Sequence, residues 1–144
     1  LSSLWENEEG LRVAACLASA SAYYACPTLL ISVVPGGDPR MPLTLVPQAS
    51  QTEHLHTLRL PSSFLIAPSD TWHLLSPHRL QFDRIIIEST AFTQESQIPS
   101  AVAAMADANL VIVKKDIGTR REVQQSVAHL ARGTRGSLSV ILQS

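Results

Sequence analysis

Five short apolar runs constrain the fold of this chain more than any other feature. The centre of each run is uncharged, and most runs are rich in branched side chains. A continuous apolar run of this length is typical of a strand that is buried on both faces of a parallel sheet. The runs occupy residues 28–34, 63–67, 83–88, 109–113 and 137–142.

Segments with a helical spacing of apolar residues lie between these runs. Strands that alternate with helices predict an α/β domain, and we expect a three-layer sandwich with a mainly parallel sheet and helices on both faces. The length of 144 residues suits a single domain over residues 1–144. The helices are expected at residues 4–24, 71–75, 100–107 and 119–132, the last of them capped by Thr119.

The stretch from residue 41 to residue 61 carries the weakest pattern. Residues 43–46 are compatible with a short strand, and residues 51–60 with a polar helix or a loop. No clear alternation of apolar and polar side chains decides between these assignments.

Residues 13–34 contain no charge, which raises the question of a membrane span. Pro27 interrupts this run, and six hydroxyl-bearing side chains are spread along it. A helix followed by a buried strand explains the same residues. We therefore expect any attachment to a membrane to come from a segment or a partner outside this chain.

The composition points to a globular domain without a nucleic-acid surface. The chain has 11 basic and 12 acidic residues, a net charge of -1 and 45% hydrophobic residues. This balance excludes intrinsic disorder and provides no basic footprint for nucleic acid. Cys16 and Cys26 form neither a disulfide framework nor a metal-binding spacing, which favours a reducing, cytoplasmic location.

The second half of the chain carries four motifs in a characteristic order. They are FDRIIIEST at 82–90, ADANLVIVK at 106–114, GTRREV at 118–123 and SVIL at 139–142. In this order they resemble the bacterial tyrosine kinase family and, more loosely, the deviant-Walker partition and septum-site ATPases. The resemblance implies a P-loop NTPase-like fold with a phosphate-binding loop directly after the strand at 28–34.

That loop has the sequence PGGDPRMP at residues 35–42. A phosphate-binding loop needs free backbone N–H groups, a lysine that reaches the phosphates and a Ser/Thr that holds magnesium. The two lysines of the chain, Lys114 and Lys115, are both far from this loop in sequence, and Pro39 and Pro42 lack an N–H. The loop therefore predicts a degenerate nucleotide site.

The resemblance assigns five residues to this degenerate site. Glu88 stands where the family has its Walker B aspartate, at the end of the strand at 83–88. The site residues are Gly36, Gly37, Asp38, Arg40 and Glu88.

One interaction motif of the family is partly present. The family carries Glu-x-x-Arg-x-x-Arg in its first helix for self-association, and this chain has Glu9 and Arg12 followed by Ala15. A surface ion pair between Glu9 and Arg12, stabilising by about 0.3 kcal/mol, explains the same two residues.

We expect a non-catalytic, pseudokinase-like interaction or regulatory domain without catalytic residues, cofactor or metal. The resemblance places it in polysaccharide biosynthesis or export, at the inner face of the membrane, with a protein partner or a second copy of itself. One alternative is an ATPase or kinase that binds ATP and Mg²⁺ through an atypical loop and Glu88. Another is a binding module like the partition ATPases.

Two further groups of side chains are candidates for binding sites. Lys114, Lys115, Arg120 and Arg121 lie near a helix N-terminus, where they would form either an anion site or a solvated basic edge. The pairs His54 with His56 and His73 with His78 lack a carboxylate or cysteine at metal-binding spacing, so we expect no metal site.

Overall fold

The computed structural model describes residues 2–3, 7–34, 36, 38, 45–64, 68–89, 98–114, 119–133 and 136–143. Its helices are α1 (Asn7–Tyr23), α2 (Pro68–Arg79), α3 (Ile98–Met105) and α4 (Arg120–Gly133), with a 3₁₀ turn η1 at Ser62–Phe64. Its strands are β1 (Ser2–Ser3), β2 (Thr28–Val34), β3 (Gln48–Ala49), β4 (Leu55–Pro61), β5 (Arg84–Glu88), β6 (Ala108–Lys114) and β7 (Ser137–Gln143).

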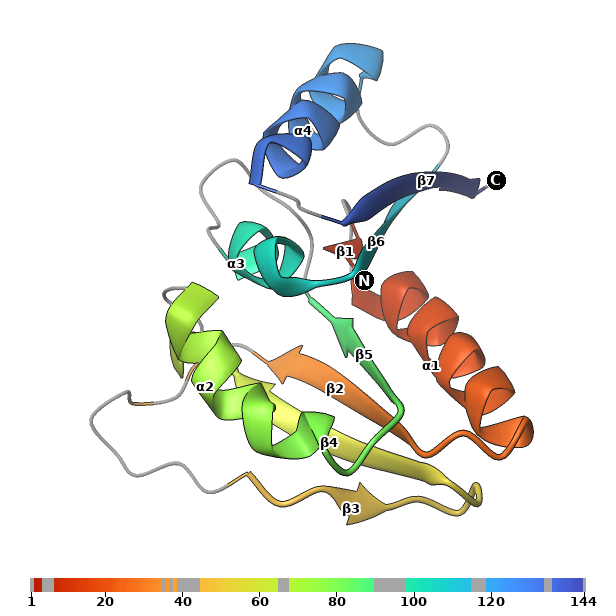
Figure 1. The fold of residues 1–144 in the computed structure, drawn as a ribbon. Coiled ribbons are helices and arrows are strands. Elements are labelled where there is room, and N and C mark those ends of the chain that lie inside the picture. The colour runs from red at the N-terminus through yellow and green to blue at the C-terminus, as the bar shows by residue number, and fades with distance from the viewer. Residues whose placement is uncertain are drawn as a thin grey trace.

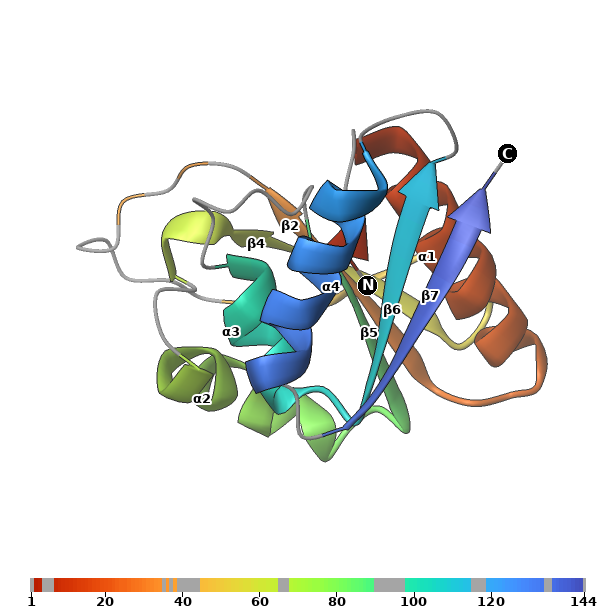
Figure 2. The ribbon, with the colours of Figure 1, turned by 90° about the horizontal axis from the view of Figure 1, so that it is seen from above.

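The strands form two hydrogen-bonded groups. One sheet has the order β3-β4-β2-β5, in which β2 is parallel to both β4 and β5 and only β3 is antiparallel. The other has the order β1-β6-β7 and is parallel throughout. Helix α1 covers one side of the strands, and α2, α3 and α4 lie on the other (Figures 1 and 2). The predicted α/β architecture with a mostly parallel sheet is confirmed.

The side chains of β2 alternate between two apolar cores, because successive residues of a strand point to opposite faces. Leu29, Ile31 and Val33 pack on the face of α2 and α3, where Leu75 and Val102 meet them. The opposite face holds Leu30 against three alanines of α1, which allow the helix to approach the sheet closely. These alanines are Ala14, Ala18 and Ala22. Four of the five predicted strands are confirmed, as β2, β5, β6 and β7.

Two predictions for the middle of the chain are wrong. Residues 51–60, expected as a polar helix or a loop, lie mostly in β4, which pairs with β2 along its whole length. The strand expected at 63–67 begins instead with η1, and residues 65–67 lie outside the described residues. The strand at 43–46 is not found at residues 45 and 46, while 43 and 44 lie outside the described part.

The helices follow the sequence pattern with shifted bounds. Helix α2 is much longer than the expected turn at 71–75 and includes Pro77 near its end, where only the last turn is affected. Helix α4 begins immediately after Thr119, as predicted. Within the described residues, no helix combines the length and the apolar character that a membrane crossing requires.

Candidate functional site

Parallel pairing brings the carboxyl ends of β2, β4 and β5 to one edge of the sheet. This is the edge at which ligands bind in open α/β sheets. The loop after β2 lies here, and of its predicted site residues the structure describes Gly36 and Asp38. Gly37 and Arg40 lie outside the described residues, so their predicted role stays a prediction.

The backbone of Gly36 is tied to the 3₁₀ turn that follows β4. Its N–H donates to Oγ of Ser62 at 3.3 Å, and its carbonyl accepts the N–H of Ser63 at 3.2 Å. Gly36 has a φ of 99°, which glycine adopts far more readily than other residues. The first N–H donor of the predicted cradle is therefore already engaged within the domain.

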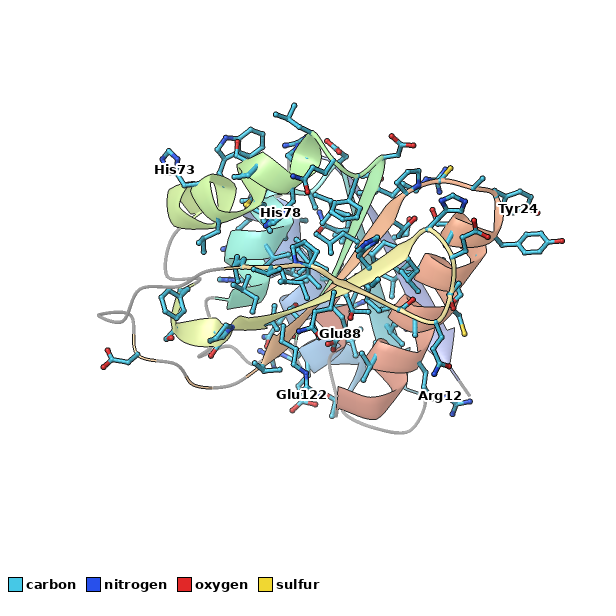
Figure 3. All side chains as sticks on the ribbon, turned by 90° about the horizontal axis from the view of Figure 1, so that it is seen from below. Arg12, Tyr24, His73, His78, Glu88 and Glu122 are labelled. Carbon is cyan, nitrogen blue, oxygen red and sulfur yellow. The ribbon has the colours of Figure 1, made fainter. Side chains whose placement is uncertain are left out.

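Glu88 ends β5 beside the end of β2, with Ser32 as its register partner. Its neighbour two residues earlier, Ile86, packs against α1, so the side chain of Glu88 points to the same face. Glu88 is only 4% exposed, and its Oε1 has no hydrogen-bond partner. Burial raises the pKa of this carboxyl above its ordinary value. Figure 3 shows Glu88 inside the domain, whereas Arg12 lies at its margin.

These features do not fit a magnesium–nucleotide site. Magnesium binds ionised carboxylates and other oxygen ligands, whereas the Glu88 carboxyl is buried, and this burial raises its pKa and so disfavours ionisation. The backbone of Lys114 lies at the end of β6, which is outside the sheet that contains β2. No other lysine except its neighbour Lys115 exists in the chain.

The start of α4, considered above as an anion site, is closed by its own side chains. The Thr119 N–H donates to Oε2 of Glu122 at 2.6 Å, and the Glu122 N–H donates to Oγ1 of Thr119 at 3.2 Å. This is a capping box, which satisfies two N–H groups that an anion would otherwise use. Hydrogen bonds to the Glu122 carboxylate from the backbone and the side chain of Thr119 lower the pKa of Glu122. Arg120 and Arg121 are exposed beside it, as expected for a solvated edge.

The outer face of α1 is the part of the predicted interaction motif that the structure describes. Arg12 is exposed on this helix, while the side chain of Glu9 lies outside the described part, so their ion pair stays untested. Four large apolar or aromatic residues of α1 and the turn after it are exposed. They are Leu11, Leu17, Tyr23 and Tyr24.

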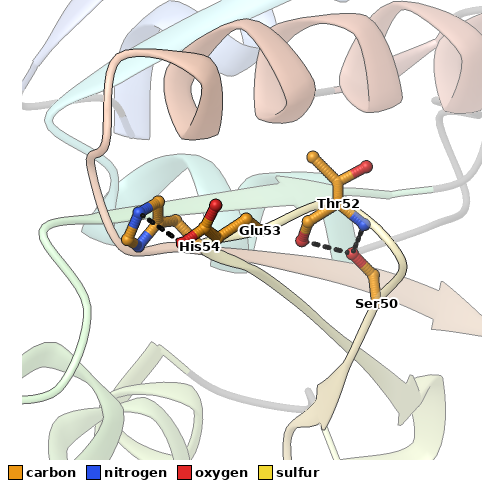
Figure 4. Close-up of polar contacts among 4 residues, drawn as sticks. All are labelled: Ser50, Thr52, Glu53 and His54. Carbon is orange, nitrogen blue, oxygen red and sulfur yellow. Dashed lines mark hydrogen bonds and ion pairs between the residues drawn. The ribbon is translucent and has the colours of Figure 1, made fainter.

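The histidines lie apart from any metal-binding cluster. Among the described residues, no group of three or more His, Cys, Asp and Glu side chains is arranged to hold a metal ion. His54 has a φ of 64° in the turn between β3 and β4, and its Nε2 lies 3.6 Å from Oε1 of Glu53. Ser50 and Thr52 close the same turn through two hydrogen bonds of 3.1 Å (Figure 4).

Sequence reasoning missed Ser62 as a functional neighbour of the loop after β2. The two residues that meet, Gly36 and Ser62, are 26 positions apart. The available signal is local: two serines follow Pro61, a pattern that is typical of a turn whose hydroxyl groups bond to the backbone.

The described helices and strands form an α/β domain with a mostly parallel sheet, and several solved structures share this fold. The chain has the fold of bacterial tyrosine kinase domains. It resembles the BceF tyrosine kinase domain with a TM-score of 0.69 at 14% identity, over 96% of this chain and 66% of that one. It matches the kinase domain of the Escherichia coli tyrosine kinase Etk with a TM-score of 0.69 at 14% identity, over 99% and 66%.

A third similar structure is the chimerical protein CapA2B2, with a TM-score of 0.69 at 15% identity, over 99% of this chain and 75% of that one. The chain thus spans about two thirds of the BceF and Etk domains. No family model matches the sequence, and no curated protein matches it either.

Proposed function

We propose that this chain is a non-catalytic domain with a bacterial tyrosine kinase fold, which binds a protein partner or a second copy of itself. The observation that carries the proposal is the state of the loop after β2. Its sequence lacks a lysine, and the N–H of Gly36 already donates to Ser62. Phosphoryl transfer depends on positioning and neutralising the phosphates, and a loop without a lysine, with the Gly36 N–H engaged, is poorly suited to both functions.

The proposal includes a setting. The sequence resemblance implies polysaccharide biosynthesis or export at the inner face of the cytoplasmic membrane, and we assign this domain to the same cytoplasmic setting. Its near-neutral charge of -1 supports contacts with a protein more than contacts with nucleic acid. Attachment to the membrane would then come from a partner or from a segment outside this chain.

A calorimetric titration with ATP and Mg²⁺ tests the proposal that the domain is non-catalytic. We expect no saturable binding at millimolar nucleotide. Magnesium-dependent binding at micromolar concentration would overturn the proposal. Titration without Mg²⁺ is the control, because a nonspecific anion contact of exposed arginines would not require the metal.

One observation favours an atypical ATPase as the second candidate. Glu88 is a carboxylate at the end of the strand beside β2, as in the Walker B arrangement. If this candidate is correct, Glu88→Gln abolishes any ATP hydrolysis that the purified domain shows. Hydrolysis that is unchanged in this variant would eliminate the candidate, and the thermal melting curve of the variant shows that it is folded.

A further inference from the structure

A cavity of about 820 Å³ separates the two groups of strands. It lies between β5, through Arg84–Ile87, and the first half of β6, through residues 108–110. Figure 2 shows these two strands next to each other. Exposed Asp83 and Asp107 line it where β5 and β6 begin, so the cavity reaches the surface at the amino ends of the strands.

The cavity explains an unexpected exposure in β5. The three isoleucines at 85–87 are only half-buried, although the sequence predicts the centre of a buried strand. The corresponding residues of β2, which has a strand on each side, are buried almost completely. The side chains of β5 thus lack the neighbouring strand that normally covers them in a parallel sheet.

Both walls of this cavity present the edge of a strand. In the described part of the chain, residues 84–86 of β5 pair only with β2. Among the residues that the structure describes, the side of β6 away from β7 pairs only with β1, at Val111 and Ile112. Residues 108–110 of β6 therefore offer backbone N–H and carbonyl groups toward the cavity in the same way that an edge strand does.

Strand β1 shows which geometry this edge accepts. Ser2 and Ser3 pair with β6 in parallel, at two positions only. The cavity lies along the line of β1, beside the preceding three residues of β6. Within the described ranges, β1 pairs with two residues of β6, whereas β7 pairs with all seven on the other side, so most of the β1 side lacks a strand partner.

The chemistry of the walls selects an apolar occupant. Side chains of α2 and α3 line the cavity on one face, including Leu75, Val102 and Met105. On the other face Leu17 of α1 and Ile86 line it. Trp72 also contributes, with the guanidinium carbon of Arg79 4.4 Å from its ring centre. A strand in this position would have mostly apolar walls, with Asn109, Ser137 and Ser139 as polar lining residues, so most of its side chains should be apolar.

We propose that the cavity between β5 and β6 accepts an extended, apolar segment of a partner protein. The segment pairs with β6 from Ala108 onward, in line with β1 and in place of β1 where the two overlap. This mode of binding adds a strand to an existing edge, with backbone hydrogen bonds for affinity and side-chain pockets for selectivity. The inference rests on the interaction part of the proposed function, and it is independent of the nucleotide part.

A blocked peptide with the sequence acetyl-Lys-Val-Ile-Val-Thr-Val-Lys-amide provides the probe. Its matched control is the same peptide with N-methyl groups on alternate residues, which removes donors and keeps the side chains. We expect saturable binding that N-methylation weakens roughly tenfold, the effect of losing about 1.4 kcal/mol of hydrogen bonding. Amide NMR shifts should concentrate at residues 84–86 and 108–110.

Two variants of β7 test the location. Ser139 lines the cavity, and Val140 points to the opposite face of the same strand. Both residues are exposed, so tryptophan is tolerated at each position. Ser139→Trp should abolish peptide binding, whereas Val140→Trp should leave it within twofold of the unchanged chain.

Three results would overturn this inference. The first is that the N-methylated peptide binds as tightly as the unmethylated one. The second is that the NMR shifts are confined to the outer edges of β3 or β7. The third is that the protein does not bind the peptide although its melting curve shows that it is folded. A titration of the same samples with Mg²⁺ and ATP separates this inference from the proposed function. Nucleotide binding would refute the non-catalytic proposal alone, and absent peptide binding would refute the strand site alone.

Discussion

Ser32 and Glu88 are register partners on β2 and β5, at the edge where these parallel strands end. The carboxylate belongs to a buried side chain, and its Oε1 has no hydrogen-bond partner. A carboxyl in this environment is stable when it is neutral and destabilises the fold when it is ionised.

Glu88→Gln tests this relationship. An uncharged amide of the same shape should raise the free energy of unfolding at pH 7 by about 1 kcal/mol. Burial raises the pKa of Glu88 in the folded state. Its favourable contribution to the free energy of unfolding is therefore complete below the ordinary pKa of 4.5 and is lost as pH rises through the folded-state pKa. The advantage of the variant should therefore shrink in acid. Urea unfolding at a series of pH values measures it.

Glu122→Gln is the matched control for this pH series. The hydrogen bonds from Thr119 lower the pKa of Glu122, so its contribution is present above the ordinary pKa and is lost as pH falls. The two variants should show opposite trends with pH. A stability difference for Glu88→Gln that does not change with pH would contradict the assignment.

Gly136→Ala should destabilise the second half of the domain by about 2 kcal/mol. A Cβ on Gly136 would overlap the carbonyl group of Asp107, because the turns that precede β6 and β7 approach closely. Gly133→Ala is the control, since a Cβ there meets no atom within 4 Å. Thermal unfolding compares them, and equal melting temperatures for the two variants would show that the approach of the turns is looser.

Thr119→Ala should lower the free energy of unfolding by about 1 kcal/mol through loss of the N-cap. The pKa of Glu122 should rise at the same time, because alanine lacks the Thr119 hydroxyl whose hydrogen bond helps to lower it. Urea unfolding and a carboxyl NMR titration measure the two effects. Thr119→Ser, which keeps the hydroxyl, should restore both, and an unchanged Glu122 titration in the alanine variant would argue against the capping box.

Arg12→Glu tests self-association through α1. If the exposed face around Leu11 and Leu17 binds a second copy, a reversed charge beside it should weaken association roughly tenfold. Light scattering over a concentration series measures the average mass. Arg132→Glu, on the exposed end of α4, should have no effect. A mass that stays unchanged in Arg12→Glu would assign any dimer to another surface.

The sequence could predict the elements whose signals are local. The run at 28–34 is apolar without interruption because β2 is buried on both faces, and the Thr119 and Glu122 spacing encodes a capping box within four residues. β4 was missed because His56, Thr57 and Arg59 interrupt its apolar pattern. Its identity as a strand comes from pairing with β2, which is distant in sequence.

The candidate site was less predictable for the same reason. The missing lysine is visible in the sequence, and so is the carboxylate of Glu88 at a strand end. The burial of that carboxylate depends on the packing of α1, and the engagement of Gly36 depends on Ser62. Contacts of this kind link positions that no local pattern connects.

The lack of strand pairing between β5 and β6 in the described part of the chain also has a consequence for how the domain unfolds. The described strands of the two groups share no ladder, and their cores differ in size. Among the described residues, twelve buried apolar residues lie around β2, β4 and β5, and four around β6. The smaller unit should therefore exchange its amide hydrogens with solvent by opening alone, while the larger unit stays intact. A strand inserted between the units would join them into one cooperative structure. Binding in the cavity should therefore slow amide hydrogen exchange throughout β6 and β7.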